Sequence, residues 1–172
     1  MLAKKVNRES YVNLLAAALP TVIQTKAEND YYLAVVEGLM RKGAAGLSKE
    51  EEALLDLLAL LIETFEREDL REMVLTLNRT ARVLAFETPG LENKFRLPRN
   101  TSDQFLLNAA RAYAADAVPL KAGFLKHEMP ADFIERLNQL ITDFEKASTE
   151  KTTAVGTHVA AKITIDETVA RG

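Results

Sequence analysis

The chain has 172 residues, an apolar fraction of 48% and a formal net charge of −3. A chain of this length suits one domain or two small helical units. The absence of cysteine excludes disulfides, thiolate zinc sites and cysteine nucleophiles. The mild charge gives no general case for nucleic acid as a partner. No apolar run is long enough to span a bilayer, and the N-terminus lacks the order of a signal peptide, so we expect no membrane and a cytoplasmic protein.

The N-terminal third predicts short helices separated by proline and glycine. Residues 11–19 form an apolar stretch that Pro20 closes. Thr25 and Glu28 have the spacing of a capping box, in which the two side chains satisfy backbone N–H groups of the first helical turn. The helix that they open is expected to cover residues 25–42, because two glycines follow soon afterwards.

A long central helix is predicted between Ser48 and Pro89, because a second capping box opens this segment and no proline or glycine interrupts it. Apolar residues recur there at steps of three and four, which marks a buried helical face: Leu54, Leu58, Leu61, Phe65, Leu70, Met73, Leu77, Ala81 and Leu84. The one five-residue step falls in the charge-dense run 66–69, where we expect a slip or a kink in the helix.

The C-terminal half predicts one long loop and several further helices. In chain order we expect a long loop over 88–100, a helix over 101–117 opened by a third capping box, a short helix over 119–127, a helix from 129 onward, a polar loop or frayed join over 148–157 and a last helix over 159–169. No alternating strand pattern competes. The sequence therefore predicts an all-α fold, an antiparallel helical bundle around a long central helix.

The first third of the chain also carries an ordered set of motifs. Pro20 to Ile23 precedes the first capping box, and a Leu-rich run over 47–66 follows a short polar turn. In this order, residues 1–66 resemble the N-terminal region of HigA-type antitoxins, which implies a toxin or another protein as partner. In that family a helix-turn-helix domain follows this region. The glycine-bearing turn of such a domain is not found downstream of Glu66, so we expect no specific DNA binding.

A second set of motifs occupies the rest of the chain: Leu77–Arg82, Thr88–Arg99, Asp103–Gln104, Ala109–Ala112 and Pro130–Phe133. Through them residues 70–172 resemble uncharacterised bacterial helical-bundle proteins, which usually continue beyond the point where this chain stops. We therefore expect a composite and shortened chain. Its predicted domains are an antitoxin-like helical segment over 1–66 and a helical bundle over 67–172, joined at the charge-dense run.

The candidate binding site is a basic loop together with two arginines that precede it: Lys94, Phe95, Arg96, Arg99, Arg79 and Arg82. From Arg79 to Arg99 there are five basic and two acidic residues, a local charge of +3 that suits a phosphate-bearing or otherwise anionic partner. We expect Leu91, Phe95 and Leu97 to anchor the loop on helices while the basic side chains face outward. The alternative is that the basic groups are merely solvated.

No catalytic constellation is recognisable. His127 and His158 lie far apart, and neither has a Glu at the spacing of a di-iron bundle. A Gly-x-Ser-x-Gly turn and a Gly-rich phosphate loop are both missing. We therefore predict no enzyme, no metal and no cofactor. The predicted function is a non-catalytic helical protein-binding module of antitoxin-like type. The alternative is a self-associating structural bundle that forms a homo-oligomer, and a small-molecule enzyme comes third.

Overall fold

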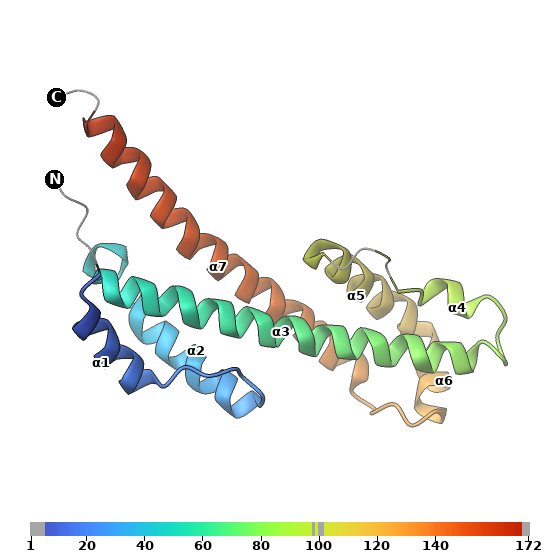
Figure 1. The fold of residues 1–172 in the computed structure, drawn as a ribbon. Coiled ribbons are helices and arrows are strands. Elements are labelled where there is room, and N and C mark those ends of the chain that lie inside the picture. Colours follow the sequence, from blue (N-terminus) through green and yellow to red (C-terminus); the bar gives the residue numbers. More distant parts are fainter. Residues whose placement is uncertain (1–5, 98, 100–101, 170–172) are drawn as a thin grey trace. The chain divides into compact units, whose positions relative to one another are not determined.

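The computed structural model describes the backbone of residues 6–97, 99 and 102–169, and the side chains of those residues up to Lys151 except Ala44. Over this part of the chain it contains helices and no strand (Figure 1). The long helix α3 (Lys49–Leu84) packs against the other helices. The predicted all-α fold, an antiparallel bundle around a long central helix, is confirmed.

The chain divides into two compact units. The first unit contains Met1–Phe65 and Lys146–Gly172, and the second contains Glu66–Glu145. Each unit has its own buried apolar cluster, and the two clusters share no residue. The predicted division placed all of 67–172 in one domain. The structure instead groups residues 146–172 with the N-terminal region.

In the first unit, α1 (Arg8–Ala18) and α2 (Lys26–Met40) pack along the first half of α3 (Figure 1). A short 3₁₀ turn, η1 (Ala44–Gly46), connects α2 to α3. The core of this unit is aliphatic apart from one tyrosine: Ala18, Ile23, Tyr32, Val36, Leu39, Leu54, Leu58, Ile62 and Ala147. Short apolar side chains therefore hold these helices together.

Side-chain caps start the helices of the first unit. Asn7 caps α1 by accepting from two backbone N–H groups of its first turn. Thr25 and Glu28 form the predicted capping box at the start of α2. Ser48 and its partner Glu51 form the second box at the start of α3, with N···O distances of 2.9 and 3.2 Å. These two sequence predictions are confirmed.

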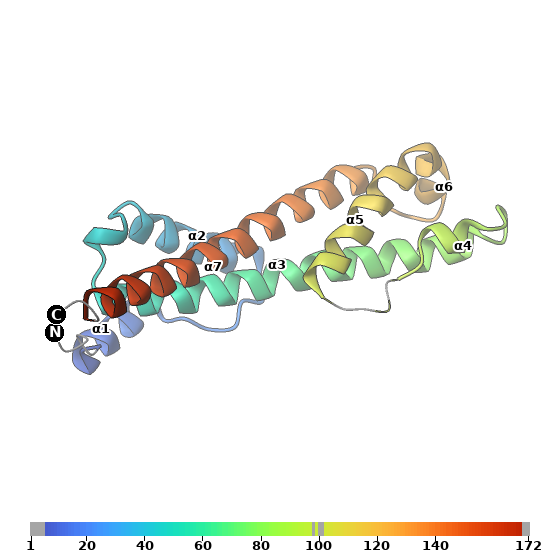
Figure 2. The same cartoon turned by 90° about the horizontal axis from the view of Figure 1, so that it is seen from above.

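The second unit is built from the second half of α3 and the helices that follow it: α4 (Leu91–Lys94), α5 (Asp103–Ala117), the 3₁₀ turn η2 (Val118–Leu120), α6 (Lys121–Lys126) and the first part of α7 (Phe133–Val169). In the view of Figure 2, α5 lies between the second half of α3 and the start of α7. Four rings pack in a row in this core, with neighbouring centroids 5.0 to 5.3 Å apart, in the order Tyr113, Phe95, Phe124 and Phe133.

The apolar face of α3 differs in detail from the predicted stripe. Ile62 and Val74 are buried, whereas the predicted Leu61 and Met73 are only half-buried. The expected slip at 66–69 is wrong, because the helix is continuous there and Glu66, only 3% exposed, occupies the buried position. Counting apolar residues alone missed this position, since it holds a carboxylate.

Two further boundaries differ from the prediction. Helix α5 begins at Asp103 with Ser102 at the N-cap position, one residue later than the predicted box, whose Thr101 lies outside the described residues. The predicted loop over 148–157 is wrong, because α7 continues through it to Val169. A glycine within a helix costs only about 1 kcal/mol relative to alanine, so Gly156 does not end it. The side chain of His158 lies outside the described residues.

Candidate functional site

The predicted basic loop has a helix inside it. Residues 91–94 form α4, so the expectation of one uninterrupted loop over 88–100 is wrong. Gly90 precedes α4 with φ of +91°, a backbone conformation that glycine adopts without steric cost. Pro89 and Gly90 therefore make the predicted turn, and the turn sets the direction in which α4 starts.

Phe95 anchors this segment to the core of the second unit. Its side chain is 0% exposed and its ring packs against the rings of Tyr113 and Phe124. Its backbone carbonyl accepts two hydrogen bonds, one from the Asn78 amide at 2.6 Å and one from the Tyr113 hydroxyl. Burial raises the pKa of Tyr113 from 10.0 to about 12, so this hydroxyl remains a donor up to strongly alkaline pH.

The five cations of the predicted site are all exposed, whereas Phe95 lies in the core and cannot contact a partner. Lys94, Arg96 and Arg99 lie on the segment that Phe95 anchors. The Lys94 ammonium is 3.9 Å from the Asp116 carboxylate, at the limit of an ion pair. Arg96 and Arg99 are exposed as well.

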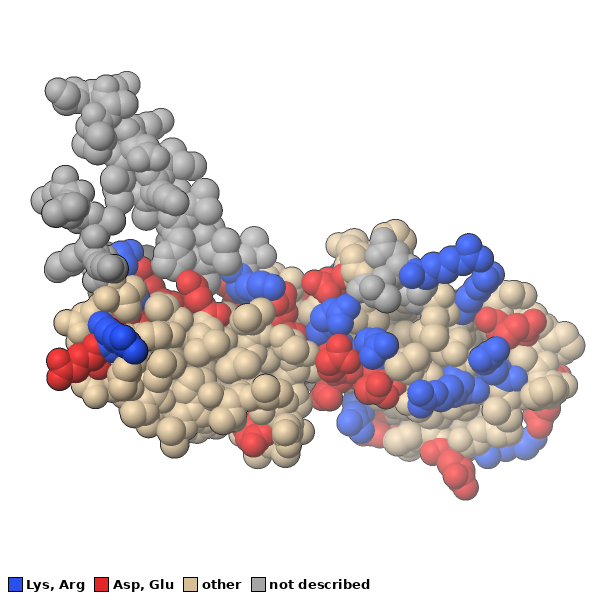
Figure 3. Space-filling model, viewed as in Figure 1, with Lys and Arg blue, Asp and Glu red and all other residues tan. Residues whose placement is uncertain are grey.

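The geometry of α3 gives the positions of Arg79 and Arg82 relative to the segment that Phe95 anchors. Asn78 contacts the backbone of Phe95. At 3.6 residues per turn, Arg82 lies about 40° around α3 from Asn78 and Arg79 about 100°. Arg82 therefore lies near the side of α3 that contacts the anchored segment, and Arg79 lies about a quarter turn further around the helix. Figure 3 shows basic and acidic side chains intermingled over the second unit. We call the five residues Arg79, Arg82, Lys94, Arg96 and Arg99 the basic surface.

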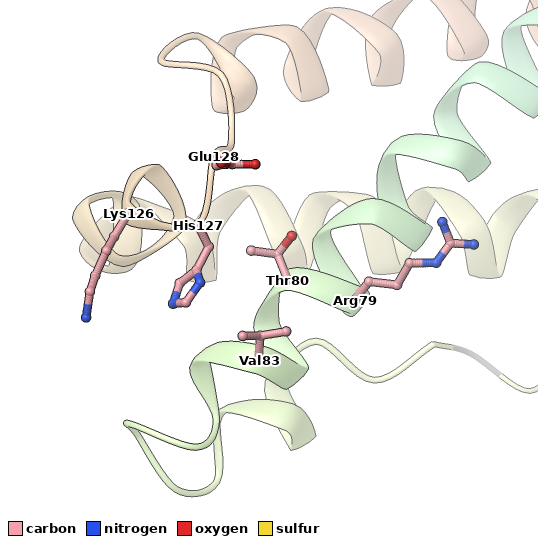
Figure 4. A pocket seen from close by; sticks show the side chains of 6 residues that line it. All are labelled: Arg79, Thr80, Val83, Lys126, His127 and Glu128. Atoms are coloured by element: carbon pink, nitrogen blue, oxygen red, sulfur yellow. The ribbon is translucent and has the colours of Figure 1, made fainter.

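An open pocket of about 380 Å³ adjoins the basic surface. Side chains from the end of α3 and the end of α6 line it: Arg79, Thr80, Val83, Lys126, His127 and Glu128. Figure 4 shows that the Arg79 guanidinium extends away from His127. The pocket therefore does not bring these two groups together, although the stem of Arg79 forms part of its wall.

The charges around this pocket largely compensate each other. Lys126 donates to both oxygens of Glu87, at 2.8 and 3.1 Å, and this contact holds the pKa of the Glu87 carboxyl below its usual value. His127 caps α6, as the sequence predicted for a helix-end histidine, and its Nε2 is buried without a hydrogen-bond partner among the described atoms. Glu128 follows with φ of +64°.

Sequence reasoning did not single out the residues that fix the basic surface. Asn78 stands inside one of the motifs quoted above, but nothing in the motif links it to a carbonyl 17 residues further on. Tyr113 lies on another helix. Among the described residues, no group of three or more potential ligands could hold a metal ion, and no helix there combines the length and apolar content that crossing a membrane requires.

Comparison with known proteins adds no relative to this description. No family model matches the chain, and no match was found among curated proteins or solved structures. The function must therefore be argued from the surfaces themselves.

Proposed function

We propose that this chain is a non-catalytic helical module that binds an acidic surface of a partner protein through the basic surface of its second unit. One observation carries the proposal: the carbonyl of Phe95 is held by two donors, Asn78 and Tyr113. A segment fixed in this way loses little conformational freedom on binding, so more of the contact energy contributes to affinity. Solvated cations on a mobile loop would not need such an anchor.

Several expectations from the sequence become part of this proposal. The partner is a protein of the cytoplasm, and the antitoxin-like character of residues 1–66 makes a small toxin protein the first partner to test. Specific DNA binding is not part of the function, because the five cations of the basic surface come without a recognition helix, and phosphate contacts alone do not distinguish sequences. The module acts without a metal, a cofactor or a catalytic residue.

The experiment compares affinity capture from host extract by three forms of the protein. The first is wild type, and the second is the triple variant Lys94→Ala, Arg96→Ala, Arg99→Ala. The third is a control that removes the same charge from the first unit: Lys26→Ala, Arg41→Ala, Lys42→Ala. We expect one protein species to be retained by wild type and control and lost from the triple variant, with retention decreasing as salt increases.

The proposal is contradicted if the triple variant captures the same species as wild type. A duplex DNA of random sequence serves as a second probe in fluorescence anisotropy. Weak binding that disappears with salt or competitor DNA agrees with the proposal. A DNA footprint that survives excess competitor would assign the basic surface to a nucleic acid instead.

A further inference from the structure

The exposed face at the end of α3 combines two arginines with two large apolar residues. Arg79, Arg82, Val83 and Phe86 follow one another at steps of three and four, so each is a neighbour of two others on the helix surface. Val83 is 48% exposed and Phe86 is 91% exposed, the highest value among the exposed large hydrophobic residues of the described part of the chain. Both arginines are exposed as well. We call these four residues the terminal patch of α3.

The backbone at Phe86 is held in place although its ring is exposed. The N–H of Phe86 donates to the carbonyl of Val83 at 3.2 Å, so the turn continues the path of α3 beyond its last residue. Leu84 is buried, and Glu87 is paired with Lys126 of α6. The Phe86 ring is therefore displayed from a fixed position, and a partner that contacts it orders little of the chain on binding.

The pocket described above opens beside the terminal patch. Val83 and the stem of Arg79 belong to its wall on α3, and the end of α6 supplies the opposite wall. Gly123 allows α6 to pack closely here, because a Cβ at this position would lie 3.1 Å from a methyl carbon of Leu84. A large apolar side chain of a partner can therefore rest on Val83 at the mouth of the pocket, next to the ring of Phe86.

The charges around the terminal patch favour an acidic partner. Within the described part of the chain, Arg79 and Arg82 form no ion pair, whereas Glu87 and Lys126 neutralise each other. Glu128 lies on the wall of the pocket that faces α3, and Figure 4 shows it apart from the Arg79 guanidinium. An acidic side chain is therefore disfavoured inside the pocket and favoured over the two arginines, while an apolar side chain suits the mouth of the pocket.

We propose that the terminal patch binds an acidic segment of the partner protein that carries a large apolar side chain. This apolar side chain packs on Val83 and Phe86, and the neighbouring carboxylates of the segment pair with Arg79 and Arg82. The inference rests on the function proposed above, because it names the kind of segment through which the acidic partner is recognised. It adds a selectivity that charge alone does not provide, since an acidic surface without an apolar side chain leaves the Phe86 ring in water.

Fluorescence anisotropy with two labelled peptides of equal charge tests the apolar contact. The first peptide is Gly-Glu-Asp-Leu-Phe-Asp-Glu-Gly, and the second has serine in place of its leucine and phenylalanine. We expect wild type to bind the first peptide about tenfold more tightly than the second. Phe86→Ala and Val83→Ala replace exposed side chains, so both variants should fold, and each should reduce this preference about threefold or more. Phe105→Ala, at an exposed position of α5, should leave the preference unchanged.

The inference is overturned if wild type binds the two peptides equally, if Phe86→Ala and Val83→Ala both keep the preference, or if neither peptide binds at millimolar concentration. Its failure differs from a failure of the proposed function, which the triple variant of Lys94, Arg96 and Arg99 tests. Equal binding of both peptides that the triple variant abolishes would leave the proposed function standing. A full preference that persists in the triple variant would support the terminal patch and contradict the role of the anchored segment.

Two other occupants of the terminal patch are separate outcomes of the test. Cosedimentation with phosphatidylglycerol vesicles that Phe86→Ala abolishes, without binding of either peptide, would assign the patch to a lipid surface. A dimer in light scattering that Phe86→Ala dissociates would assign it to a second copy of the chain. Either result would replace the acidic segment as the occupant and overturn the inference.

Discussion

In each unit a buried tyrosine hydroxyl holds the backbone of an exposed segment, but the exposed side chains are aliphatic in the first unit and basic in the second. In the first unit the Tyr32 hydroxyl donates to the carbonyl of Leu19, and in the second unit the Tyr113 hydroxyl donates to the carbonyl of Phe95. The segment in the first unit presents exposed aliphatic side chains, whereas the segment in the second unit presents Lys94 and Arg96. A buried tyrosine thus sets where a segment lies, and the neighbouring residues decide what it can bind.

The largest expected effect concerns the anchor of the basic surface. Phe95→Ala should destabilise the protein by about 3–5 kcal/mol, because it empties a fully buried aromatic position. Urea unfolding followed by circular dichroism measures the change. Phe105→Ala, at a 49% exposed position of α5, should change stability by less than about 0.5 kcal/mol. Equal effects of the two substitutions would contradict the anchoring role of Phe95.

The next comparison concerns the two apolar clusters, because α3 contributes a fully buried leucine to each of them. Leu58 and Leu77 are both 0% exposed, one in each apolar cluster. Replacing either by Ala should cost roughly 2–5 kcal/mol, the usual range for a buried leucine. Leu60→Ala, at a 48% exposed position of α3, is the control. If Leu58→Ala and Leu77→Ala melted like this control, the assignment of the buried face of α3 would be wrong.

Replacing Tyr32 and Tyr113 by phenylalanine tests directly whether their hydroxyl groups hold the two exposed segments. Tyr32→Phe and Tyr113→Phe each remove only a hydroxyl, and each should cost about 1–3 kcal/mol. Their effects on proteolysis should differ. Tyr32 bonds to two backbone groups of residues 19–21, so its loss should speed cleavage there. Asn78 still holds the carbonyl of Phe95 when Tyr113 is replaced. Faster cleavage of the basic segment in Tyr113→Phe would show that Asn78 alone is insufficient.

The capping boxes of the first unit should give a smaller effect. Thr25→Ala and Ser48→Ala each remove a side-chain acceptor for a backbone N–H of the first helical turn. Each should lower stability by about 1 kcal/mol. Thr64→Ala removes a hydroxyl that bonds within α3 at an exposed site, and should have almost no effect. Thermal melts of the three variants make the comparison, and a Thr64→Ala effect as large as the others would contradict it.

A further expected effect is a pH dependence of the stability of the second unit. Burial raises the pKa of Tyr113 from its ordinary 10.0 to about 12, so the folded state keeps a proton that the unfolded chain releases. The contribution of Tyr113 to stability is therefore complete below pH 10 and declines as the pH rises toward 12. Denaturant midpoints across this range should decrease more steeply in wild type than in Tyr113→Phe. Parallel curves would show that Tyr113 titrates normally.

The sequence predicts helix starts and core faces better than it predicts long-range contacts. Capping boxes are local, so Thr25 and Ser48 could be assigned from spacing alone. The donors to the carbonyl of Phe95 lie 17 and 18 residues away on two different helices, and no local pattern links them to it. The predicted break at 148–157 failed because glycine and threonine weaken a helix without ending it.

The same distinction limits what could be predicted of the binding surfaces. The basic residues were recognisable because charge is a property of composition. The apolar half of the terminal patch was not, because apolar residues near the end of a helix are taken to face the core. Only the structure separates Leu84, which is buried, from Val83 and Phe86, which are exposed.

The division into units also bears on the order in which the protein forms during synthesis. The second unit is one continuous stretch of chain, Glu66–Glu145, whereas the first unit needs residues from both sides of that stretch. The core of the first unit includes Ala147, and Lys151 donates to the buried carboxylate of Glu63. During synthesis the second unit can therefore fold before Ala147 and Lys151 emerge from the ribosome, whereas the core of the first unit is complete only after they emerge.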